Sequence, residues 1–397
     1  MKFISFALLI CLCLPLCADA EADQEFGWET GWSHKMAWVA APVYETSGPV
    51  FPEKAGFHLD SSFKASHILD NGLKLGAHLT LGLQLDHPGR KGFAGTLGEV
   101  PAMHPADRRV LLSAQRGAFT GLAPLGHLEE DRLQARLQAG FIYVDGGYGE
   151  VLAGLDSGIA RRFYEGPPNI FKYARLSNAR LDTSGIAALL TRNDLSGPSF
   201  KVSYATPRLL GVRFGASYSP RANRSSLDRT PNLDIAGIAE PHMSDIAEFA
   251  VNISRRHRAS GIRFEAYGAF ARARLRLLPD KIENGTVEVW SGGVRVNWKG
   301  LDFGMDALTS DNGAGRYTAW SMGGHVELSS NWQASLNYGQ ARDDALTARS
   351  ETWSAGVARA LARRVTLALG VQSQKTDFEY RQPLSYLAPV VEISLSF

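Results

Sequence analysis

The chain has 397 residues, of which 45% are hydrophobic and 21% are charged, and its formal net charge at pH 7 is +2. So small an imbalance argues against a protein that binds nucleic acid, because such proteins carry a large excess of Lys and Arg. The three cysteines are Cys11, Cys13 and Cys17. The chain beyond Cys17 can therefore form neither a disulfide scaffold nor a cysteine metal site.

Residues 1–20 have the pattern of a secretory signal peptide. Met1 and Lys2 precede an apolar run over residues 3–16, and Ala18-Asp19-Ala20 provides small residues for cleavage. The run is too short to span the ~30 Å hydrocarbon core of a bilayer. A membrane anchor and a lipoprotein site at Cys17 are the alternatives. We expect cleavage after Ala20 and export of residues 21–397.

Alternation of apolar and polar side chains predicts β-strands along most of the remaining chain. The clearest run is residues 73–86, where apolar residues occupy every second position. Asp70-Asn71-Gly72, typical of a hairpin turn, separates this run from a second one over residues 57–66. Fourteen alternating residues are many for a strand of a soluble protein. They suit a tilted strand that crosses a bilayer.

The same alternation continues to the end of the chain. A first strand is predicted within residues 32–44, and residues 133–143 form a later one with Arg136 and Gln138 on its polar face. The other strands are predicted over residues 148–156, 200–205, 212–218, 245–256, 261–272, 286–298, 301–308, 317–328, 332–341, 351–361, 364–374 and 387–397. Long polar connections cover residues 87–130 and 219–244, and residues 157–199 form one long loop with room for a helical turn.

Every second connection between these strands is short, and the strands number about 16, an even number that allows a barrel to close. In residues 391–397 the odd positions are apolar and the even ones are mostly polar, and the last residue is Phe397. Such an edge would aggregate in a soluble sheet, whereas in a closed barrel it pairs with the first strand. Aromatic residues near strand ends fall on the apolar face of their strands, where an interfacial girdle would lie: Trp290, Trp298, Trp320, Trp332, Tyr338 and Trp353.

These features predict an all-β fold, a transmembrane antiparallel β-barrel, in preference to a β-sandwich. A single sandwich of this length would be oversized for one core.

The order of the motifs resembles that of the Gram-negative outer-membrane general porin family, especially its α-proteobacterial type. Residues 57–86 are similar to the second and third strands of that family, and residues 140–158 (GFIYVDGGYGEVLAGLDSG) to the run into its inward-folded third loop. Residues 192–220 are similar to the exit from that loop. Where family members usually carry an arginine, this chain has Leu155.

The resemblance implies a water-filled channel in the bacterial outer membrane for passive diffusion of small hydrophilic solutes and ions. It also implies a homotrimer in outer-membrane lipid, with Phe397 as the signal for the barrel assembly machinery and residues 157–199 as a constriction loop in the lumen.

Charged residues of polar parity are the candidates for the channel lining. The predicted basic wall consists of Lys64, Lys74, His78, Arg132, Arg136 and Arg213. If the long loop folds inward, its acidic residues face this wall: Asp156, Glu165, Asp182 and Asp194. Opposed charges across a narrow aqueous gap would orient dipolar solutes and select between ions without a binding site.

The sequence contains no P-loop, no G-x-S-x-G elbow and no H-E-x-x-H motif. We therefore predict that the protein is not an enzyme and requires no cofactor or metal. A substrate-specific channel is an alternative, but it would line the lumen with an arginine ladder or aromatic residues, whereas most tryptophans here have lipid-facing parity. An outer-membrane enzyme or adhesin is the third hypothesis, and no Ser-His pair can be placed for the enzyme.

Overall fold

The structure is a computed structural model that describes residues 27–42, 45–47, 55–85, 90–91, 94–96, 119, 122–123, 134–184, 188–222, 242–276, 285–311, 315–344, 347–379 and 382–397. The predicted signal peptide and Arg132 lie outside these residues.

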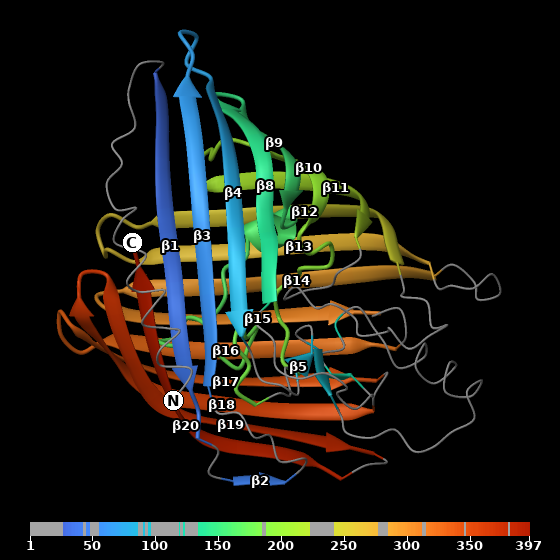
Figure 1. The fold of residues 1–397 in the computed structure, drawn as a ribbon, viewed down its shortest axis with the longest axis vertical. Helices are drawn as coiled ribbons and strands as arrows, with labels where there is room; N and C mark the ends of the chain where they lie inside the picture. The colour runs from blue at the N-terminus through green and yellow to red at the C-terminus, as the bar shows by residue number, and fades with distance from the viewer. Residues whose placement is uncertain are drawn as a thin grey trace.

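The described residues form twenty strands and one short helix (Figure 1). They are β1 (Trp28–Ala40), β2 (Glu45–Ser47), β3 (Ala55–Ile68), β4 (Lys74–Leu85), β5 (Arg90–Lys91), β6 (Ala94–Thr96), β7 (Leu122–Ala123), β8 (Gln134–Gly146), β9 (Gly149–Asp156), α3 (Ile159–Arg162), β10 (Ser199–Ala205), β11 (Val212–Ala222), β12 (His242–Arg256), β13 (Arg263–Arg276), β14 (Gly285–Trp298), β15 (Leu301–Ser310), β16 (Tyr317–Glu327), β17 (Trp332–Asp343), β18 (Ala348–Ala362), β19 (Val365–Phe378) and β20 (Leu384–Ser396).

One antiparallel sheet closes on itself to form the barrel. Consecutive long strands pair with each other, and β1 pairs with both β3 and β20, with Lys35 opposite Ser396. Phe397 continues this closure, since its N–H donates to the carbonyl of His34 at 2.9 Å. The 17-stranded sheet includes the short β2, which only extends β20. Without β2, sixteen strands form the closed barrel, as the sequence predicted.

Side chains alternate between two environments along each barrel strand. In β10, Phe200 is 72% exposed and Val202 and Tyr204 are also exposed, whereas the serines, Lys201 and Ala205 between them are buried. In β20, Ile393 is exposed while Glu392 and Ser394 are buried. The exposed face is apolar, which suits contact with lipid, and the other face carries the polar residues.

The aromatic residues predicted as a girdle lie on the apolar face. Trp290, Trp298, Trp332 and Trp353 are all exposed there. Trp320 of β16 packs against Tyr338 of β17 with ring centroids 5.5 Å apart. Aromatic side chains at these positions suit the boundary between hydrocarbon and headgroups.

A bulge in β8 reverses part of the predicted face assignment. Leu81 lies opposite Leu137 and Thr80 lies opposite Ala139, so Gln138 has no partner in β4. Beyond this extra residue the parity changes, because side chains alternate with a period of two. Ile142 is 66% exposed on the apolar face, whereas Phe141, expected there from simple alternation, stacks on His78 with centroids 5.0 Å apart.

The connections are short at one end of the barrel and long at the other, as predicted. Several strand ends differ from the prediction. β1 begins at Trp28, before the expected 32–44 range, and β11 continues to Ala222 and β12 begins at His242, inside the expected 219–244 loop. β5, β6 and β7 form a separate three-stranded sheet within the expected 87–130 connection. Among the described residues, no helix is long and apolar enough to cross a membrane.

Candidate functional site

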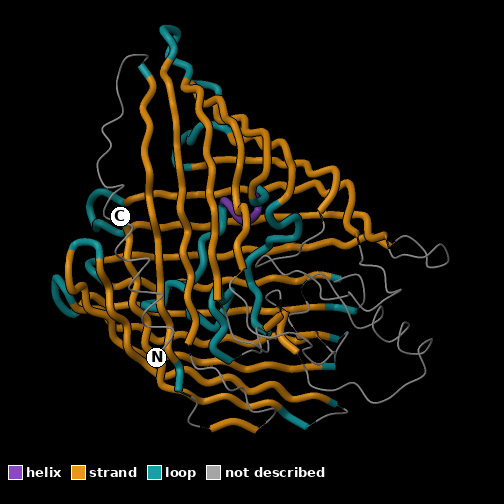
Figure 2. Tube along the Cα trace, in the orientation of Figure 1, coloured by secondary structure: helices purple, strands orange, loops and turns teal. Residues whose placement is uncertain are grey.

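The candidate site is the 157–198 segment that connects β9 to β10, together with the polar faces of the strands it contacts. Figure 2 shows its helix α3 in purple and the loop that follows in teal. The segment begins against β11 and β12, because the N–H groups of Ile159 and Ala160 donate to Ser217 Oγ at 3.1 Å and Glu248 Oε2 at 3.2 Å. The backbone amides at the start of the segment are thus satisfied by wall side chains.

The next part of the segment lies directly on the backbone of three adjacent strands. Residues 165–168 pass over Gly293 of β14, Gly304 of β15 and Gly323 of β16. A Cβ atom on Gly304 would lie 3.0 Å from Cα of Pro167, and one on Gly293 would lie 2.9 Å from the carbonyl oxygen of Glu165. The missing side chains therefore make room for the segment.

Glu392 of β20 holds the middle of the segment. Its carboxylate is 1% exposed and accepts backbone N–H groups from Lys172 at 2.9 Å, Tyr173 at 3.1 Å and Ala174 at 3.0 Å. Gln372 of β19 donates from Nε2 to the carbonyl oxygen of Ala174 at 2.5 Å. Hydrogen bonds to a carboxylate are about twice as strong as neutral ones, so Glu392 binds this part of the segment firmly.

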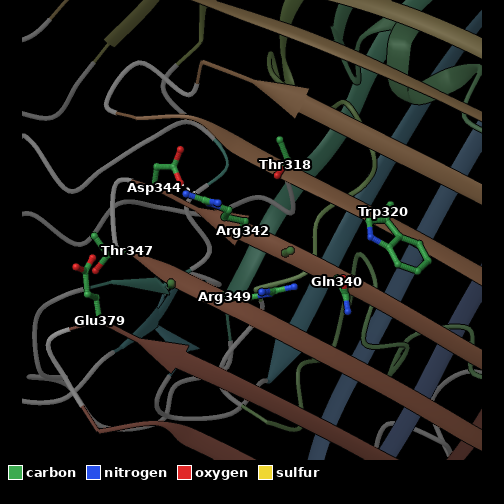
Figure 3. A pocket seen from close by; sticks show the side chains of 10 residues that line it. Thr318, Trp320, Gln340, Arg342, Asp344, Thr347, Arg349 and Glu379 are labelled. Carbon is green, nitrogen blue, oxygen red and sulfur yellow. Dashed lines mark hydrogen bonds and ion pairs between the residues drawn. The ribbon is translucent and has the colours of Figure 1, made fainter.

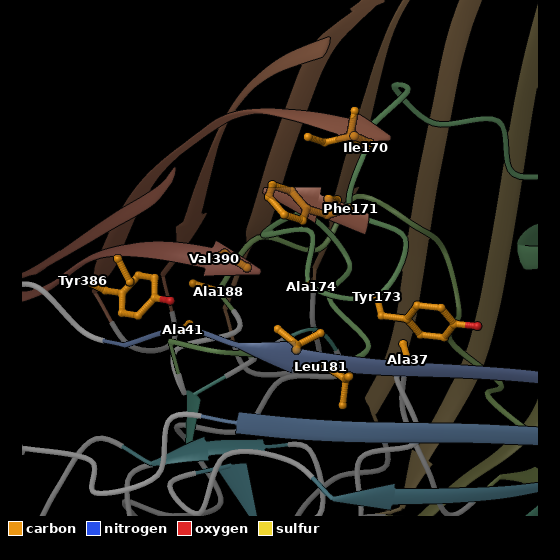
Figure 4. Close-up of a cluster of buried hydrophobic side chains, with 14 of the residues drawn as sticks. Ala37, Ala41, Ile170, Phe171, Tyr173, Ala174, Leu181, Ala188, Tyr386 and Val390 are labelled. Carbon is orange, nitrogen blue, oxygen red and sulfur yellow. The ribbon is translucent and has the colours of Figure 1, made fainter. Parts of the chain in front are cut away.

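An apolar cluster lies beside the Glu392 contact (Figure 4). Phe171, Leu181 and other residues of the segment pack with Ala37 of β1 and with Tyr386 and Val390 of β20. All five are nearly fully buried. This packing adds a hydrophobic contribution to the polar one and fixes the segment against the junction that closes the barrel.

The segment also contacts β3 and β4, which lie on the other side of β1 from β20. Arg180 Nη1 lies 2.7 Å from Asp60 Oδ2, and Gln84 Nε2 donates to the carbonyl oxygen of Arg180 at 2.6 Å. His58 Nε2 lies 2.9 Å from Asp60 Oδ1, and Nε2 of Gln138, the bulged residue of β8, donates to the same oxygen at 2.7 Å. Asp60 is thus the centre of a polar network that joins the segment to β3, β4 and β8.

Asn178 and Asp306 organise the return of the segment. Asn178 has φ 54°, and its Oδ1 accepts the N–H groups of Thr191 and Arg192, both at 3.0 Å. Thr191 Oγ1 donates to Asp306 of β15 at 2.7 Å, and the hydroxyl of Tyr164 donates to the same carboxylate. These bonds join Asn178 to Thr191 and Arg192 within the segment, and they hold Tyr164 and Thr191 against β15.

The charges of the segment differ in their exposure. Its six cations are half-buried or exposed: Arg161, Arg162, Lys172, Arg175, Arg180 and Arg192. Two of its three carboxylates are buried, since Asp182 is 2% and Asp194 is 1% exposed. The segment therefore presents mainly positive charge at its surface.

The four predicted acidic residues lie in different surroundings. Asp194 pairs with Arg161 at 2.6 Å, and Asp182 accepts from Ser184 at 2.6 Å. Burial would raise the pKa of Asp194, but the positive charges of Arg161, Arg192 and Lys201 outweigh it and lower the pKa. Asp156 is half-buried at the end of β9. Neither Asp182 nor Asp194 presents its carboxylate to solvent.

Glu165 is the half-buried acid of the segment. It accepts from Asn252 of β12 at 3.4 Å. Burial, followed by the negative charge of Glu265, raises its pKa, and Arg295 opposes this effect. The negative charge of Glu165 is therefore lost at a higher pH than that of an ordinary glutamate.

Five of the six predicted basic residues are described, and all have the polar parity of their strands. Lys64 is exposed and Lys74 and Arg136 are half-buried. His78 is half-buried against Phe141 and is bonded to Thr80 Oγ1 at 2.8 Å. Arg213 stacks on Phe163 of the segment at 5.5 Å and donates to the carbonyl of Thr206 at 2.9 Å.

The sequence analysis did not single out His58, Asp60, Asn178, Asp306 or Glu392. The available signal was an acidic or amide side chain of polar parity in the middle of an apolar strand. Such a side chain is costly to bury unless it is bonded. Asp60, Asp306 and Glu392 all satisfy that description.

A pocket of about 560 Å³ lies near the loop ends of β16 to β18, outside this site (Figure 3). Its lining includes Trp320, Arg342 and Arg349, which have the outward parity of their strands. Arg342 pairs with Asp344 at 2.7 Å. None of the predicted site residues lines it. Within the described part of the chain, no group of three or more His, Cys, Asp or Glu residues is placed to hold a metal ion.

The fold is similar to that of several solved outer-membrane proteins. The outer membrane channel DcaP of Acinetobacter baumannii is 12% identical with a TM-score of 0.58, covering 94% of this chain and 98% of that one. An anion-selective porin from Comamonas acidovorans is 12% identical with a TM-score of 0.53, covering 93% and 100%. The trimer form of OmpT of Vibrio cholerae is 10% identical with a TM-score of 0.53, covering 94% and 100%.

Compared by sequence with curated proteins, the chain matches none. Residues 53–379 match the protein family described as Gram-negative porin. This match covers more than half of the chain and agrees with the closed sixteen-stranded barrel. The protein therefore belongs to the Gram-negative porin family and is a channel of the bacterial outer membrane.

Proposed function

We propose that the protein is a general diffusion porin in which residues 157–199 form a constriction loop inside the barrel, leaving a water-filled path for small hydrophilic solutes and ions. The observation that carries this proposal is the set of contacts made by the segment. It bonds to β3 through Asp60, to β12 through Glu248, to β15 through Asp306 and to β20 through Glu392. Contacts with strands so far apart in a closed sheet support a path of the segment across the interior.

General diffusion is favoured over transport of one specific substrate. A specific channel needs aromatic or hydrogen-bonding side chains spaced along its lumen. In this barrel the described tryptophans of β14, β16, β17 and β18 have outward parity. A passive channel without enzymatic activity is the function that this arrangement supports.

The assembly of the protein is part of the same proposal. Exposed apolar residues on β4, β8 and β10, such as Leu81, Ile142 and Phe200, offer a surface to lipid or to a second copy. One structurally similar protein is a trimer. We propose a homotrimer in outer-membrane lipid, and Phe397, which is exposed beside the closing junction, as the residue that the barrel assembly machinery binds.

Cysteine modification tests the location of the segment. All native cysteines lie at positions 11, 13 and 17, so a cysteine introduced after the signal peptide is unique. Lys172 is exposed on the segment, and Phe200 is exposed on the outer face of β10. In planar bilayers, a charged thiosulfonate reagent should reduce the conductance of Lys172→Cys and leave that of the matched Phe200→Cys variant unchanged.

Equal responses of the two variants would contradict an interior segment. Absence of conductance from the folded wild type would contradict the channel function itself.

A further inference from the structure

The outward face of β16 to β19 changes from apolar to charged toward the ends of the long connections. Strand pairing places the side chains of this face in rows across the four strands. The first row is Met322, Tyr338, Trp353 and Ser373, the second is Trp320, Gln340, Glu351 and Lys375, and the third is Thr318, Arg342, Arg349 and Asp377. The pocket of about 560 Å³ in Figure 3 lies at the second and third rows. It therefore has a tryptophan on its apolar side and two arginines on its charged side.

The third row lies where the apolar band of a membrane barrel ends. Trp332 is exposed at the start of β17, and Arg342 is ten residues further along the same strand. A strand that rises ~3.4 Å per residue with a tilt of about 40° advances ~26 Å over that distance, close to the ~25 Å height of the apolar band in outer-membrane barrels. The long connections of such barrels are extracellular. Arg342 and Arg349 therefore lie at the level of the lipid headgroups of the outer leaflet.

Arg342 and Arg349 are directly opposite each other on adjacent strands. Cβ atoms of directly opposite residues are about 4.5–5.5 Å apart, and two like charges in such a pair destabilise a sheet. Arg342 Nε donates to Asp344 at 2.7 Å. Arg349 is exposed and forms no ion pair among the described residues, and the nearby Asp377 pairs with Lys375 at 3.1 Å. The two arginines thus repel each other, and a single carboxylate pairs with them.

Arg349 points into the pocket. Figure 3 shows its guanidinium directed toward Gln340 and away from Glu379. Glu379 lies at the other side of the pocket, where its N–H donates to the carbonyl of Thr347 at 3.3 Å. The guanidinium of Arg349 is therefore open to a ligand that enters from the membrane side.

The floor of the pocket is fixed by side-chain contacts. The Gln340 amide nitrogen donates to the Tyr338 hydroxyl at 2.7 Å, and that hydroxyl donates to Glu351. The rings of Trp320 and Tyr338 pack together with centroids 5.5 Å apart. A floor that is held before a ligand arrives reduces the entropy lost on binding.

We propose that this pocket binds the phosphate-bearing headgroup of an outer-leaflet lipid, with the phosphate between Arg342 and Arg349. A guanidinium presents paired N–H donors that match two oxygens of a phosphate, and the bound phosphate would offset the repulsion between the arginines. Trp320 suits the boundary between headgroup and acyl chains. The chains would then lie along the exposed Met322 and Leu336. The site is outside the channel, so it does not depend on where the 157–198 segment lies.

Native mass spectrometry of the purified protein in detergent tests this site. The probe is dioleoyl phosphatidic acid, and its control is dioleoylglycerol, which has the same chains without the phosphate. The wild type should retain phosphatidic acid in preference to dioleoylglycerol. The Arg342→Gln, Arg349→Gln variant should weaken the binding of phosphatidic acid by about tenfold, the factor for one lost hydrogen bond to a charged group. Equal retention of the two lipids by the wild type would overturn the proposal.

The matched control is the Arg272→Gln, Arg274→Gln variant. Both arginines are exposed near the end of β13 that leads into a long connection. Each has a carboxylate partner, Glu288 at 3.5 Å and Asp245 at 3.4 Å. This variant removes the same charge from the same end of the barrel and should bind phosphatidic acid like the wild type. Equal losses in the two double variants would refute a specific site.

Melting temperatures give a second readout that does not depend on the double variant. Without lipid, Arg349→Gln should melt higher than the wild type, because it removes one of two like charges. With phosphatidic acid, the wild type should gain more stability than Arg349→Gln. A lower melting temperature of Arg349→Gln without lipid, or an equal gain of both proteins, would overturn the proposal. Equal stabilisation by inorganic phosphate at the same concentration would also overturn it, since a free anion would then suffice.

Conductance in planar bilayers separates this site from the channel. The Arg342→Gln, Arg349→Gln variant should conduct like the wild type, and a changed conductance would place these arginines in the channel and refute the outward site. A wild type that prefers phosphatidic acid but does not conduct would refute the channel function and support the lipid site.

Discussion

Replacing Glu392 by glutamine removes a charge that three backbone amides of the 157–198 segment share. In the wild type, Oε1 accepts from Lys172 at 2.9 Å, and Oε2 accepts from Tyr173 at 3.1 Å and Ala174 at 3.0 Å. Glutamine has nearly the same shape but only one acceptor oxygen, and its NH₂ group would face an N–H donor. At least one of the three bonds is then lost, and the others become neutral.

Each hydrogen bond to a charged group contributes about 1.5–3 kcal/mol. The loss of one bond and the weakening of two therefore loosens this part of the segment by about 3 kcal/mol. That difference corresponds to opening on the order of 10²-fold more often. Hydrogen–deuterium exchange of a peptide spanning residues 170–176, followed in detergent, should be faster in Glu392→Gln by a factor of that order.

The matched control is Ser394→Ala. Ser394 lies two residues further along the same face of β20 and is 5% exposed, but within the described residues its side chain makes no hydrogen bond to the segment. This variant should exchange like the wild type over residues 170–176. Equal exchange in Glu392→Gln and Ser394→Ala would refute the conclusion that the carboxylate holds the segment.

Three further predictions concern the segment and the wall. Burial raises the pKa of Glu165 above its ordinary value, so its negative charge disappears as the pH falls through that raised pKa. Reversal potentials should therefore shift toward anion preference on acidification, and a Glu165→Gln channel that kept the same shift would assign the titration to another group. Gly304→Ala should destabilise the protein by about 1–3 kcal/mol through overpacking, because the new Cβ would lie 3.0 Å from Pro167 Cα. Gly324→Ala is the control, since its Cβ has its nearest neighbours at 4.0 Å. Equal melting temperatures of the two variants would contradict the overpacking at Gly304. Deleting Gln138 should remove the bulge and leave Ile142 on the apolar face, because Leu137 and Ala139 then follow each other in strict alternation; the heat-modifiable band on gels should persist, and its loss would contradict this.

Most of the barrel could be predicted because its strands obey a period of two. The leucines of residues 73–86 and the alternation of residues 391–396 define lipid-facing and polar faces without any tertiary information, and the structure follows both. The bulge at Gln138 could not be predicted in the same way. A single extra residue leaves the local composition unchanged, and only the pairing with Thr80 and Leu81 reveals it.

The site was predictable in outline only. Parity placed Lys64, Lys74 and Arg213 on the polar face, where they lie. The partners of the loop charges depend on contacts between residues far apart in the sequence, such as Arg180 with Asp60 across 120 positions. The same applies to the burial of Asp182 and Asp194. Loop residues do not alternate with a fixed period, so the sequence does not show whether a charged side chain there faces solvent or another side chain.

The junction of β1 with β20 has a consequence for the order of folding. Almost every other strand pair joins neighbours in the chain and can form as a hairpin soon after synthesis. The closing pair joins Lys35 to Ser396, so it waits for the last strand. Until then the sheet carries two unpaired edges, which are templates for aggregation. Loss of β20 alone would therefore expose both β1 and β19 and remove Glu392, leaving an open sheet without the carboxylate that binds Lys172, Tyr173 and Ala174.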